Sequence, residues 1–232
     1  MLQDIHIDNN NQYSKIITVF KCYDISLYRI NEIMCVVAVV PQDQRLTLED
    51  FEDMYSYNDD GIGFGYIRTQ KNRRILKVFK SIKWTPQKAF EVYTKIANKL
   101  SVGPMVVHFR AKSVGAVNKQ NCHPFRITTD VIMAHNGTIT IPKIYDGLMS
   151  DTWHYAQYLK GIYGGSFSKY LKEMNHQLAI EKSVGDYNKL VFLTLDQQEP
   201  VVTLGKWETD KGIKFSNTYW REIMNENIDI VC

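Results

Sequence analysis

A single cysteine at the head of an apolar run is the residue of this chain best suited to covalent chemistry. Cys35 follows Met34 and opens the run Val36–Val40, which ends at Pro41. This β-branched run predicts a strand buried on both faces, with the cysteine at the end that solvent and substrate reach. If the chain began at Cys35, a free α-amine with a pKa near ~8 would stand beside the thiol as a base. A buried, inert thiol is the alternative interpretation of this position taken alone.

Two later stretches contain further residues able to bind or catalyse. The first is HFRAKSVG at residues 108–115, followed by NCHPF at 121–125. The second is AHNGTI at residues 134–139, followed by SDT at 150–152. Together with Met34-Cys35, their order, spacing and residue types resemble the class II glutamine amidotransferases, whose glutaminase domain is of the N-terminal-nucleophile (Ntn) hydrolase type. The resemblance covers roughly residues 34–221.

The resemblance implies a nucleophile and an oxyanion hole. Cys35 would attack the side-chain amide of glutamine, and its α-amine would shuttle the proton. The attack creates a tetrahedral oxyanion, which needs hydrogen-bond donors where the negative charge develops. Asn136, through its side-chain amide, and Gly137, through its backbone N–H, correspond to these donors, with His135 orienting the loop. Taken alone, Asn-Gly is typical of a hairpin turn.

The resemblance also implies two opposite charges that bind the amino-acid end of glutamine. Arg110 corresponds to the clamp on the α-carboxylate, because a guanidinium forms two parallel hydrogen bonds with a carboxylate. The backbone from Ser113 to Gly115 would line this pocket. Asp151 corresponds to the partner of the α-ammonium group, and a helix N-cap is its alternative role. Ala111 departs from the family, in which a bulky aromatic residue often follows the arginine.

The N-terminal segment also departs from the family, in which the nucleophile is the first residue of the mature chain. β-Branched and aromatic residues between Tyr13 and Tyr28 predict one or two short strands there. Three explanations stay open. Translation starts at Met34, or residues 1–33 are a propeptide that is removed, or they are retained and block the amine. We therefore treat residues 1–33 as an N-terminal extension and residues 34–232 as the amidotransferase-like domain.

Composition limits the class of protein. A chain of 232 residues is long enough for one large domain with a substantial core. The net charge of +3 and the scattered basic residues give no support to a nucleic-acid partner. No apolar run approaches the ~20 residues of a membrane span, and no signal peptide is recognisable, so we expect a cytoplasmic protein without a membrane partner.

The cysteines predict neither a disulfide framework nor a zinc site. They are far apart and form no CxxC pair, at positions Cys22, Cys35, Cys122 and Cys232. We therefore expect no metal and no cofactor. His108 and His123 are interpreted as buried structural residues.

Strands and helices of ordinary length are predicted to position these motifs. We expect strands near residues 35–40, 62–67, 74–83, 105–109, 127–134, 188–195, 200–204 and 213–218. We expect helices to begin after Thr47, near Pro86 and at Ser150, with one more over residues 167–180. Gly103-Pro104 is expected to separate the second helix from the next strand, and His135-Asn136-Gly137 to form a turn. This pattern predicts an α+β fold, and the resemblance specifies the four-layer αββα Ntn-hydrolase sandwich.

Three functions are compatible with this sequence. The resemblance implies a glutaminase that releases ammonia from L-glutamine, with a separate synthase accepting the ammonia because no synthetase domain follows. The second is a hydrolase of another γ-glutamyl amide. The third is a catalytically silent binding or regulatory domain, in which residues 1–33 block the amine.

Overall fold

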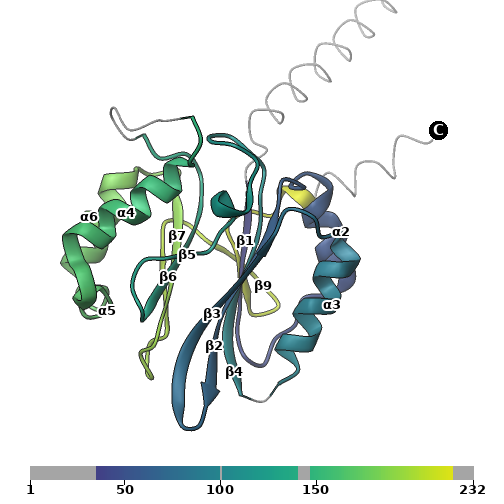
Figure 1. The fold of residues 1–232 in the computed structure, drawn as a ribbon, viewed down its shortest axis with the longest axis horizontal. Helices are drawn as coiled ribbons and strands as arrows, with labels where there is room; N and C mark the ends of the chain where they lie inside the picture. The colour runs from purple at the N-terminus through teal and green to yellow at the C-terminus, as the bar shows by residue number, and fades with distance from the viewer. Residues whose placement is uncertain (1–34, 100, 141–146, 222–232) are drawn as a thin grey trace, which may run out of the picture. The chain divides into compact units, whose positions relative to one another are not determined.

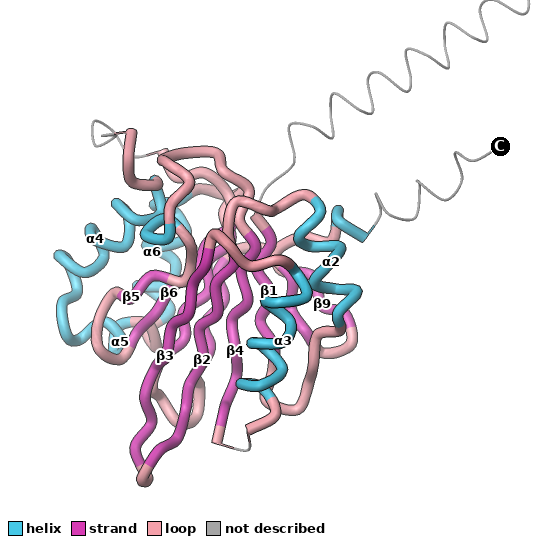
Figure 2. The backbone as a smooth tube through the Cα atoms, turned by 45° about the vertical axis from the view of Figure 1, so that its right-hand side comes forward, coloured by secondary structure: helices cyan, strands magenta, loops and turns pink. Residues whose placement is uncertain are grey.

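The computed structural model describes residues 35–99, 101–140 and 147–221, which lie within one compact unit, Met34–Cys232. The predictions for residues 1–33 lie outside the described residues. The described part combines helices with antiparallel sheets, as the predicted α+β class requires (Figures 1 and 2). Within this part of the chain, no helix is long and apolar enough to cross a membrane.

The larger sheet has six strands in the order β3-β2-β4-β1-β10-β9, and neighbouring strands are antiparallel. Its strands are β1 (Val36–Val40), β2 (Ile62–Gln70), β3 (Arg73–Ser81), β4 (Val102–Phe109), β9 (Glu208–Asp210) and β10 (Ile213–Phe215). Strand β1 lies between β4 and β10, and each of its residues is buried. The predicted strand buried on both faces is therefore confirmed, and Cys35 directly precedes it.

The smaller sheet has four strands in the order β5-β6-β7-β8. These are β5 (Phe125–Arg126), β6 (Val131–Asn136), β7 (Lys189–Thr194) and β8 (Val201–Leu204). The hairpin between β7 and β8 turns at Asp196, whose carboxylate accepts from the backbone N–H groups of Gln198 and Glu199 at 3.0 and 2.8 Å. Strands were predicted near residues 188–195 and 200–204, and both are confirmed.

The three helices expected after Thr47, near Pro86 and at Ser150 begin at these positions. They are α2 (Leu48–Ser56), α3 (Pro86–Ala97), α4 (Asp151–Tyr163), α5 (Phe167–Tyr170) and α6 (Met174–Val184), with short 3-10 helices η1 (Lys119–Asn121) and η2 (Gly164–Ser166). Thr47 forms a reciprocal capping box with Asp50 at the start of α2. The side chains of Thr85 and Ser150 accept hydrogen bonds from the first turns of α3 and α4.

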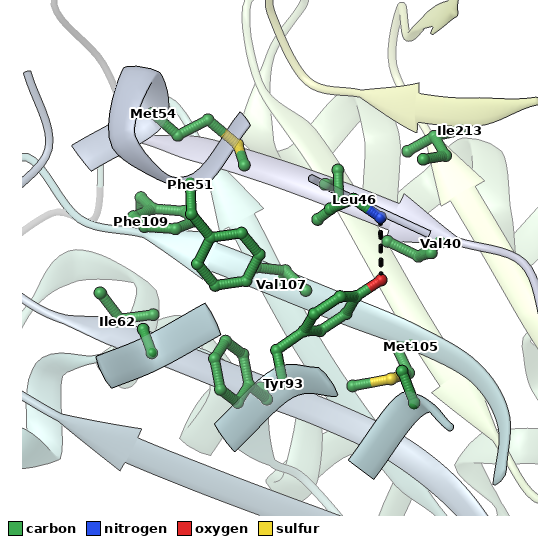
Figure 3. Close-up of a cluster of buried hydrophobic side chains, with 14 of the residues drawn as sticks. Val40, Leu46, Phe51, Met54, Ile62, Tyr93, Met105, Val107, Phe109 and Ile213 are labelled. Atoms are coloured by element: carbon green, nitrogen blue, oxygen red, sulfur yellow. Dashed lines mark hydrogen bonds between the residues drawn. The ribbon is translucent and has the colours of Figure 1, made fainter. Parts of the chain in front are cut away.

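Three clusters of buried side chains hold the elements together. Helices α2 and α3 pack on one face of the six-stranded sheet through aromatic residues such as Phe51, Tyr93 and Phe109 (Figure 3). The Tyr93 hydroxyl accepts a hydrogen bond from the backbone N–H of Leu46 at 3.0 Å. A second cluster joins α4, α5 and α6 to the four-stranded sheet, and a third joins the two sheets.

Alternation along the strands decides which side chains meet between the sheets. In β1, Val37 and Val39 belong to the cluster between the sheets, whereas Val36, Ala38 and Val40 belong to the cluster under α2 and α3. Successive side chains of a strand point to opposite faces. Cys35 lies two residues before Val37, so its side chain points to the same face, toward the four-stranded sheet. Asn136, at the end of β6, lies two residues after Ala134, so its side chain also points toward the six-stranded sheet.

The predicted break at Gly103-Pro104 is wrong, because both residues lie inside β4. The pairing of β2 with β4 changes register between Tyr66 and Arg68, opposite this part of β4. Proline donates no backbone hydrogen bond, and such an irregularity is where a sheet accommodates it.

The strand predicted over residues 127–134 is displaced. Strand β6 runs over Val131–Asn136, because the hydroxyl of Thr128 donates to the carboxylate of Asp130 at 2.6 Å and turns the chain first. His135 and Asn136 therefore end a strand and do not form a turn, which corrects the predicted turn at residues 135–137.

The single helix predicted over residues 167–180 is also wrong, since α5 and α6 are separate. Leu171 is the C-cap of α5 and is fully buried in the cluster beneath the helices, and the chain leaves the helical path at Glu173, whose backbone is extended. The side-chain amide of Gln177 donates to the carbonyl of Leu171 at 2.7 Å, so this carbonyl at the C-terminal end of α5 is hydrogen-bonded.

Candidate active site

Cys35 lies opposite Arg110 across the pairing of β1 and β4, in which Val36 pairs with Phe109. The half-buried thiol donates to the carbonyl oxygen of Ala111 at 3.3 Å, its hydrogen-bond partner among the described residues. The backbone carbonyl of Cys35 accepts a hydrogen bond from the side chain of Asn217 at 3.1 Å. The cysteine is therefore held from two directions, by the segment after β4 and by the segment after β10.

Burial raises the pKa of the Cys35 thiol to about 11. The hydrogen bond to Ala111 and the positive charge of Arg110 lower this pKa, and the negative charge of Asp151 raises it. The two predicted substrate-binding charges thus affect the thiol in opposite directions. With a pKa this high the thiol is protonated at neutral pH, so nucleophilic attack requires a base.

Ser216 connects the strand of the cysteine to the strand of Asn136. The backbone N–H of Val37 donates to Ser216 Oγ at 2.9 Å, and the backbone N–H of Ser216 donates to the Val37 carbonyl at 2.9 Å. Asn136 Nδ2 lies 3.1 Å from the same Ser216 Oγ. One buried hydroxyl thus joins β1 to the end of β6, and it brings Asn136 to the same end of the two sheets as Cys35.

Gly137 follows Asn136 with a backbone conformation that favours glycine. Its φ is 131°, and a Cβ at this position would lie 2.3 Å from Asn188 Oδ1. That oxygen faces Nε2 of the buried His135 at 2.7 Å, so Nε2 donates, and Nδ1 then accepts from the Thr152 hydroxyl at 2.8 Å. Burial lowers the pKa of His135, which favours this neutral ring. His135 therefore ties the end of β6 to α4.

Asp151 is the first residue of α4 and is almost completely buried. Its Oδ2 accepts from the backbone N–H of Ile139 at 2.6 Å, and its Oδ1 accepts from the backbone N–H of Thr152 at 2.7 Å. Ser150, and not Asp151, is the N-cap, because its hydroxyl accepts from the backbone N–H of Trp153 at 3.1 Å. The alternative role considered for Asp151 is thus filled by its neighbour.

Arg110 is buried at the end of β4 and donates to the loop that follows it. Its Nη1 and Nη2 donate to the carbonyl oxygens of Ala116 and Val114 at 3.0 and 3.1 Å. These bonds fold residues 111–116 around the guanidinium, and the backbone of Arg110 also pairs with Asp60 and Gly61. The side chain predicted to clamp a carboxylate is therefore held in one orientation by the backbone.

The two other predicted pocket residues differ in their surroundings. Gly115 has a φ of 78°, and a Cβ there would lie 2.8 Å from the backbone nitrogen of Ser150, so only glycine lets this loop approach the start of α4. Ser113 is exposed, and no hydrogen bond of its side chain occurs within the described residues. The structure thus brings Cys35, Arg110, Asn136, Gly137, Asp151 and Gly115 together, and leaves Ser113 at the surface of the loop.

Two further histidines lie beneath the site. His108 and His123 are buried with ring centroids 4.1 Å apart, and burial lowers both pKa values well below the usual range. His123 Nδ1 accepts from the backbone N–H of His135 at 3.2 Å. Within the described residues, neither ring is hydrogen-bonded to Cys35. Both are neutral packing residues, as their structural interpretation predicted.

Sequence reasoning missed Ser216 and Asn217, which hold Asn136 and Cys35. The run of residues 215–220 resembles a late segment of small amidotransferase-like proteins, but it carries no acid, base or nucleophile pattern that would reveal a role. The relevant signal was two polar residues directly after the short strand β10. Only the pairing of β10 with β1 shows which groups they contact.

Comparison with known families gives one match. The family described as glutamine amidotransferases class-II matches residues 31–153, a range that contains Cys35, Arg110, Asn136, Gly137 and Asp151 and ends before Ser216. No curated protein compared with the chain matches it.

Proposed function

The chain belongs to the class II glutamine amidotransferases, and on that premise we propose that it is a glutaminase whose nucleophile is Cys35. The proposed substrate is L-glutamine, with another γ-glutamyl amide as the alternative. The arrangement of α2 and α3 on one sheet and α4 to α6 on the other supports the finer proposal of an αββα Ntn-hydrolase sandwich.

The proposed reaction begins with transfer of the Cys35 proton to a base. The sulfur then bonds to the carbonyl carbon of the glutamine side chain, and the π electrons of the carbonyl move to oxygen. Collapse of this intermediate breaks the C–N bond, and the leaving nitrogen takes a proton to depart as ammonia. Water then attacks the γ-glutamyl thioester, so that glutamine and water become glutamate and ammonia and the thiol is regenerated.

The base we propose is the α-amine of Cys35 itself, freed when the preceding residues are absent. The thiol pKa of about 11 supports this, because an unassisted thiol would supply very little thiolate at neutral pH. An α-amine with a pKa near ~8 is partly neutral at that pH and lies on the same residue as the sulfur.

The observation that carries the proposal is the position of Arg110 directly across from Cys35 in the pairing of β1 with β4, with Asp151 at the start of α4. Arg110 and Asp151 come from β4 and α4, yet both act on the Cys35 pKa. A positive and a negative group beside a nucleophile suit the carboxylate and ammonium of an α-amino acid. We propose that Asn136 and Gly137 donate to the oxyanion, and that Gly115 and Ser113 shape the loop around the substrate.

The test compares two forms of the chain. One begins at Met1 and the other at Met34, and intact mass shows which of them carries Cys35 as its first residue. We expect glutamate and ammonia from L-glutamine only with the form that begins at Cys35, and none after Cys35→Ala. Other γ-glutamyl amides are assayed in parallel, and a preference for one of them would select the alternative substrate.

Equal hydrolysis by both forms would contradict the amine as base. Stabilisation by glutamine without turnover, in a form verified to begin at Cys35, would contradict the glutaminase and support a binding domain. Activity of the Cys35→Ala variant at the wild-type rate would remove the cysteine from the mechanism.

A further inference from the structure

The Asn136 side-chain amide has one partner and one unpaired atom. Asn136 is fully buried, and its Nδ2 lies 3.1 Å from Ser216 Oγ. Its Oδ1 has no hydrogen-bond partner among the described residues. A buried acceptor without a partner keeps its full desolvation penalty, so this orientation of the amide is disfavoured.

The Ser216 hydroxyl shows which orientation satisfies the groups better. The backbone N–H of Val37 donates to Ser216 Oγ at 2.9 Å, and a backbone N–H can only donate. If Asn136 Nδ2 also donates, Ser216 accepts twice, and its own proton has no acceptor in the described part of the chain. A hydroxyl between one donor and one amide is better satisfied when it accepts from the first and donates to the second.

A half-turn of the Asn136 amide exchanges Oδ1 and Nδ2 with little change in shape. Oδ1 then accepts the Ser216 proton, and Ser216 relays one hydrogen bond from Val37 to Asn136. Nδ2 takes the position that Oδ1 held and presents a donor on the side away from Ser216. An oxyanion requires a donor there, and an amide oxygen would repel it.

The geometry points to Ser216 as a positioning residue that sets the catalytic orientation of the Asn136 amide, with Oδ1 on Ser216 and Nδ2 facing the substrate. This inference rests on the proposed glutaminase function. It assigns a role to a residue outside the range that matches the family, residues 31–153.

The surroundings of Ser216 make it a rigid support. Its side chain is buried, its backbone N–H donates to the Val37 carbonyl at 2.9 Å, and the next residue, Asn217, donates to the Cys35 carbonyl at 3.1 Å. The segment after β10 therefore holds the proposed nucleophile and the proposed oxyanion donor together. A shift of one is transmitted to the other through Ser216.

A double-mutant cycle in the form that begins at Cys35 tests whether Ser216 affects catalysis through Asn136. We expect Ser216→Ala to lower kcat at least ~10-fold with KM for glutamine within about twofold, because transition-state stabilisation is lost while substrate binding remains. In the Asn136→Ala background, Ser216→Ala should have no further effect on kcat. Equal losses of kcat in both backgrounds would overturn the inference and leave Ser216 a purely structural partner of Val37.

Thr85→Ala is the matched control for stability. It removes a hydroxyl that accepts a backbone hydrogen bond at the start of α3, away from Cys35. We expect it to lower the melting temperature without changing kcat. A loss of kcat in this control comparable to that of Ser216→Ala would attribute both effects to destabilisation and contradict the inference.

Neutron diffraction from deuterated crystals of the full chain tests the orientation without reference to activity. Nitrogen and oxygen scatter neutrons differently, and deuterium positions are visible. We expect the Ser216 deuterium to point at Asn136 Oδ1. Deuterium on Asn136 Nδ2 directed at Ser216 would overturn the assignment. If Asn136 has the expected orientation but the protein shows no glutaminase activity, the proposed function is contradicted and the orientation set by Ser216 is not.

Discussion

The carboxylate of Asp151 accepts a hydrogen bond from the backbone N–H of Ile139 at 2.6 Å, across a separation of 12 residues. This bond fastens the segment that directly follows Asn136 and Gly137 to the first turn of α4. The same carboxylate is the group proposed to bind the α-ammonium of the substrate. In the proposed function, substrate recognition and the position of the oxyanion donors therefore depend on one side chain.

Asp151→Asn should weaken glutamine binding more than it slows the chemical step. The amide removes the negative charge and can accept from only one of the two N–H groups that Asp151 now holds. Loss of a charge-assisted hydrogen bond of about 1.5–3 kcal/mol corresponds to a KM increase of roughly 10–100-fold. Steady-state measurement of glutamate release over a range of glutamine concentrations checks this.

Ser150→Ala is the matched control at the same helix start. It removes the N-cap hydrogen bond to Trp153 and should cost about 1 kcal/mol of stability without changing KM. An unchanged KM in Asp151→Asn would remove the carboxylate from the substrate site. A raised KM in the control would show that any disturbance of this helix end weakens binding.

The alkylation of Cys35 should depend on whether Met34 is attached. In the chain that retains Met34, burial holds the thiol pKa at about 11, so the thiolate fraction rises about tenfold per pH unit between pH 7 and 10. The rate of iodoacetamide alkylation, measured at this residue by peptide mass spectrometry, should rise in parallel. In the form that begins at Cys35, the profile should bend near ~8, where the α-amine titrates.

Identical pH profiles of alkylation for the two forms would show that the α-amine does not affect ionisation of the Cys35 thiol. Cys122 provides the internal comparison, because it is a buried thiol whose pKa is also raised by burial and which is not the proposed nucleophile. Its rate should be the same in both forms. A change at Cys122 would indicate a general opening of the domain.

Much of the candidate site was predictable because each motif stands at the end of a strand. Cys35, Arg110 and Asn136 lie at the ends of β1, β4 and β6, where a strand delivers a side chain to a fixed position. Residue types at such positions can be recognised from sequence, since the apolar strands next to them have a clear pattern. The order of the motifs then identified the family.

The supporting contacts were not predictable from the sequence. Ser216 contacts Val37 across 179 residues, and no local pattern encodes a contact that depends on the pairing of two sheets. The inclusion of Pro104 in β4, opposite the register change in β2, and the break between α5 and α6 have the same origin. Each is set by tertiary packing, which overrides the local signals for breaks and helices.

Gly115→Ala should disturb the substrate loop without touching a side chain of the site. The φ of 78° is strained for alanine, and the new Cβ would lie 2.8 Å from the backbone of Met149 and Ser150. We expect a loss of more than about 1 kcal/mol of stability and a raised KM, because the loop carries the carbonyl groups that orient Arg110.

Gly161→Ala is the control for that substitution. Gly161 lies in α4 with open space where its Cβ would be, so alanine should stabilise the helix by about 0.5–1 kcal/mol and leave KM unchanged. Wild-type KM in Gly115→Ala would show that the loop does not contribute to the site.

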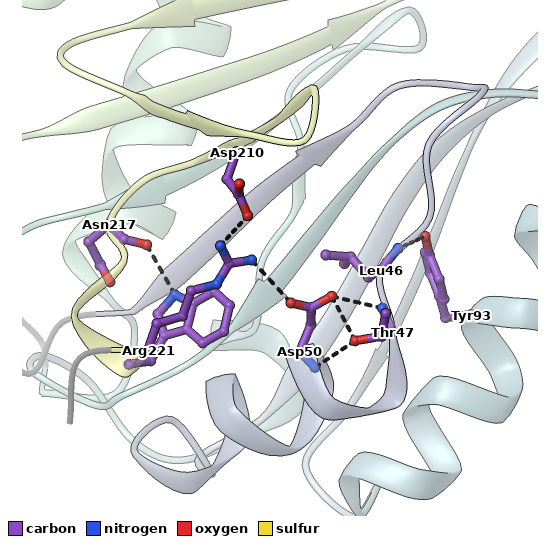
Figure 4. Close-up of polar contacts among 8 residues, drawn as sticks. Leu46, Thr47, Asp50, Tyr93, Asp210, Asn217 and Arg221 are labelled. Atoms are coloured by element: carbon purple, nitrogen blue, oxygen red, sulfur yellow. Dashed lines mark hydrogen bonds and ion pairs between the residues drawn. The ribbon is translucent and has the colours of Figure 1, made fainter. Parts of the chain in front are cut away.

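Arg221 joins elements that are far apart in the sequence. Its guanidinium is hydrogen-bonded to Asp210, which ends β9, and to Asp50 of α2 at 3.1 Å (Figure 4). It also lies over the rings of Phe215 and Trp220, 5.0 and 4.6 Å from their centroids. These contacts fasten β9 and β10 to α2, and β10 leads directly to Ser216.

Arg221→Met should therefore lower the melting temperature at pH 7 by about 2–4 °C. Its hydrogen bond lowers the pKa of Asp210 from the usual 3.8. A lowered carboxyl pKa stabilises the folded state above the unfolded-state pKa, and the effect is lost as pH falls through the folded-state pKa. The difference in melting temperature between wild type and variant should thus shrink below pH 3.8.

Lys95→Met is the control: it breaks the exposed ion pair with Glu91 and should change the melting temperature little. A pH-independent difference would assign the effect of Arg221 to its stacking on the aromatic rings.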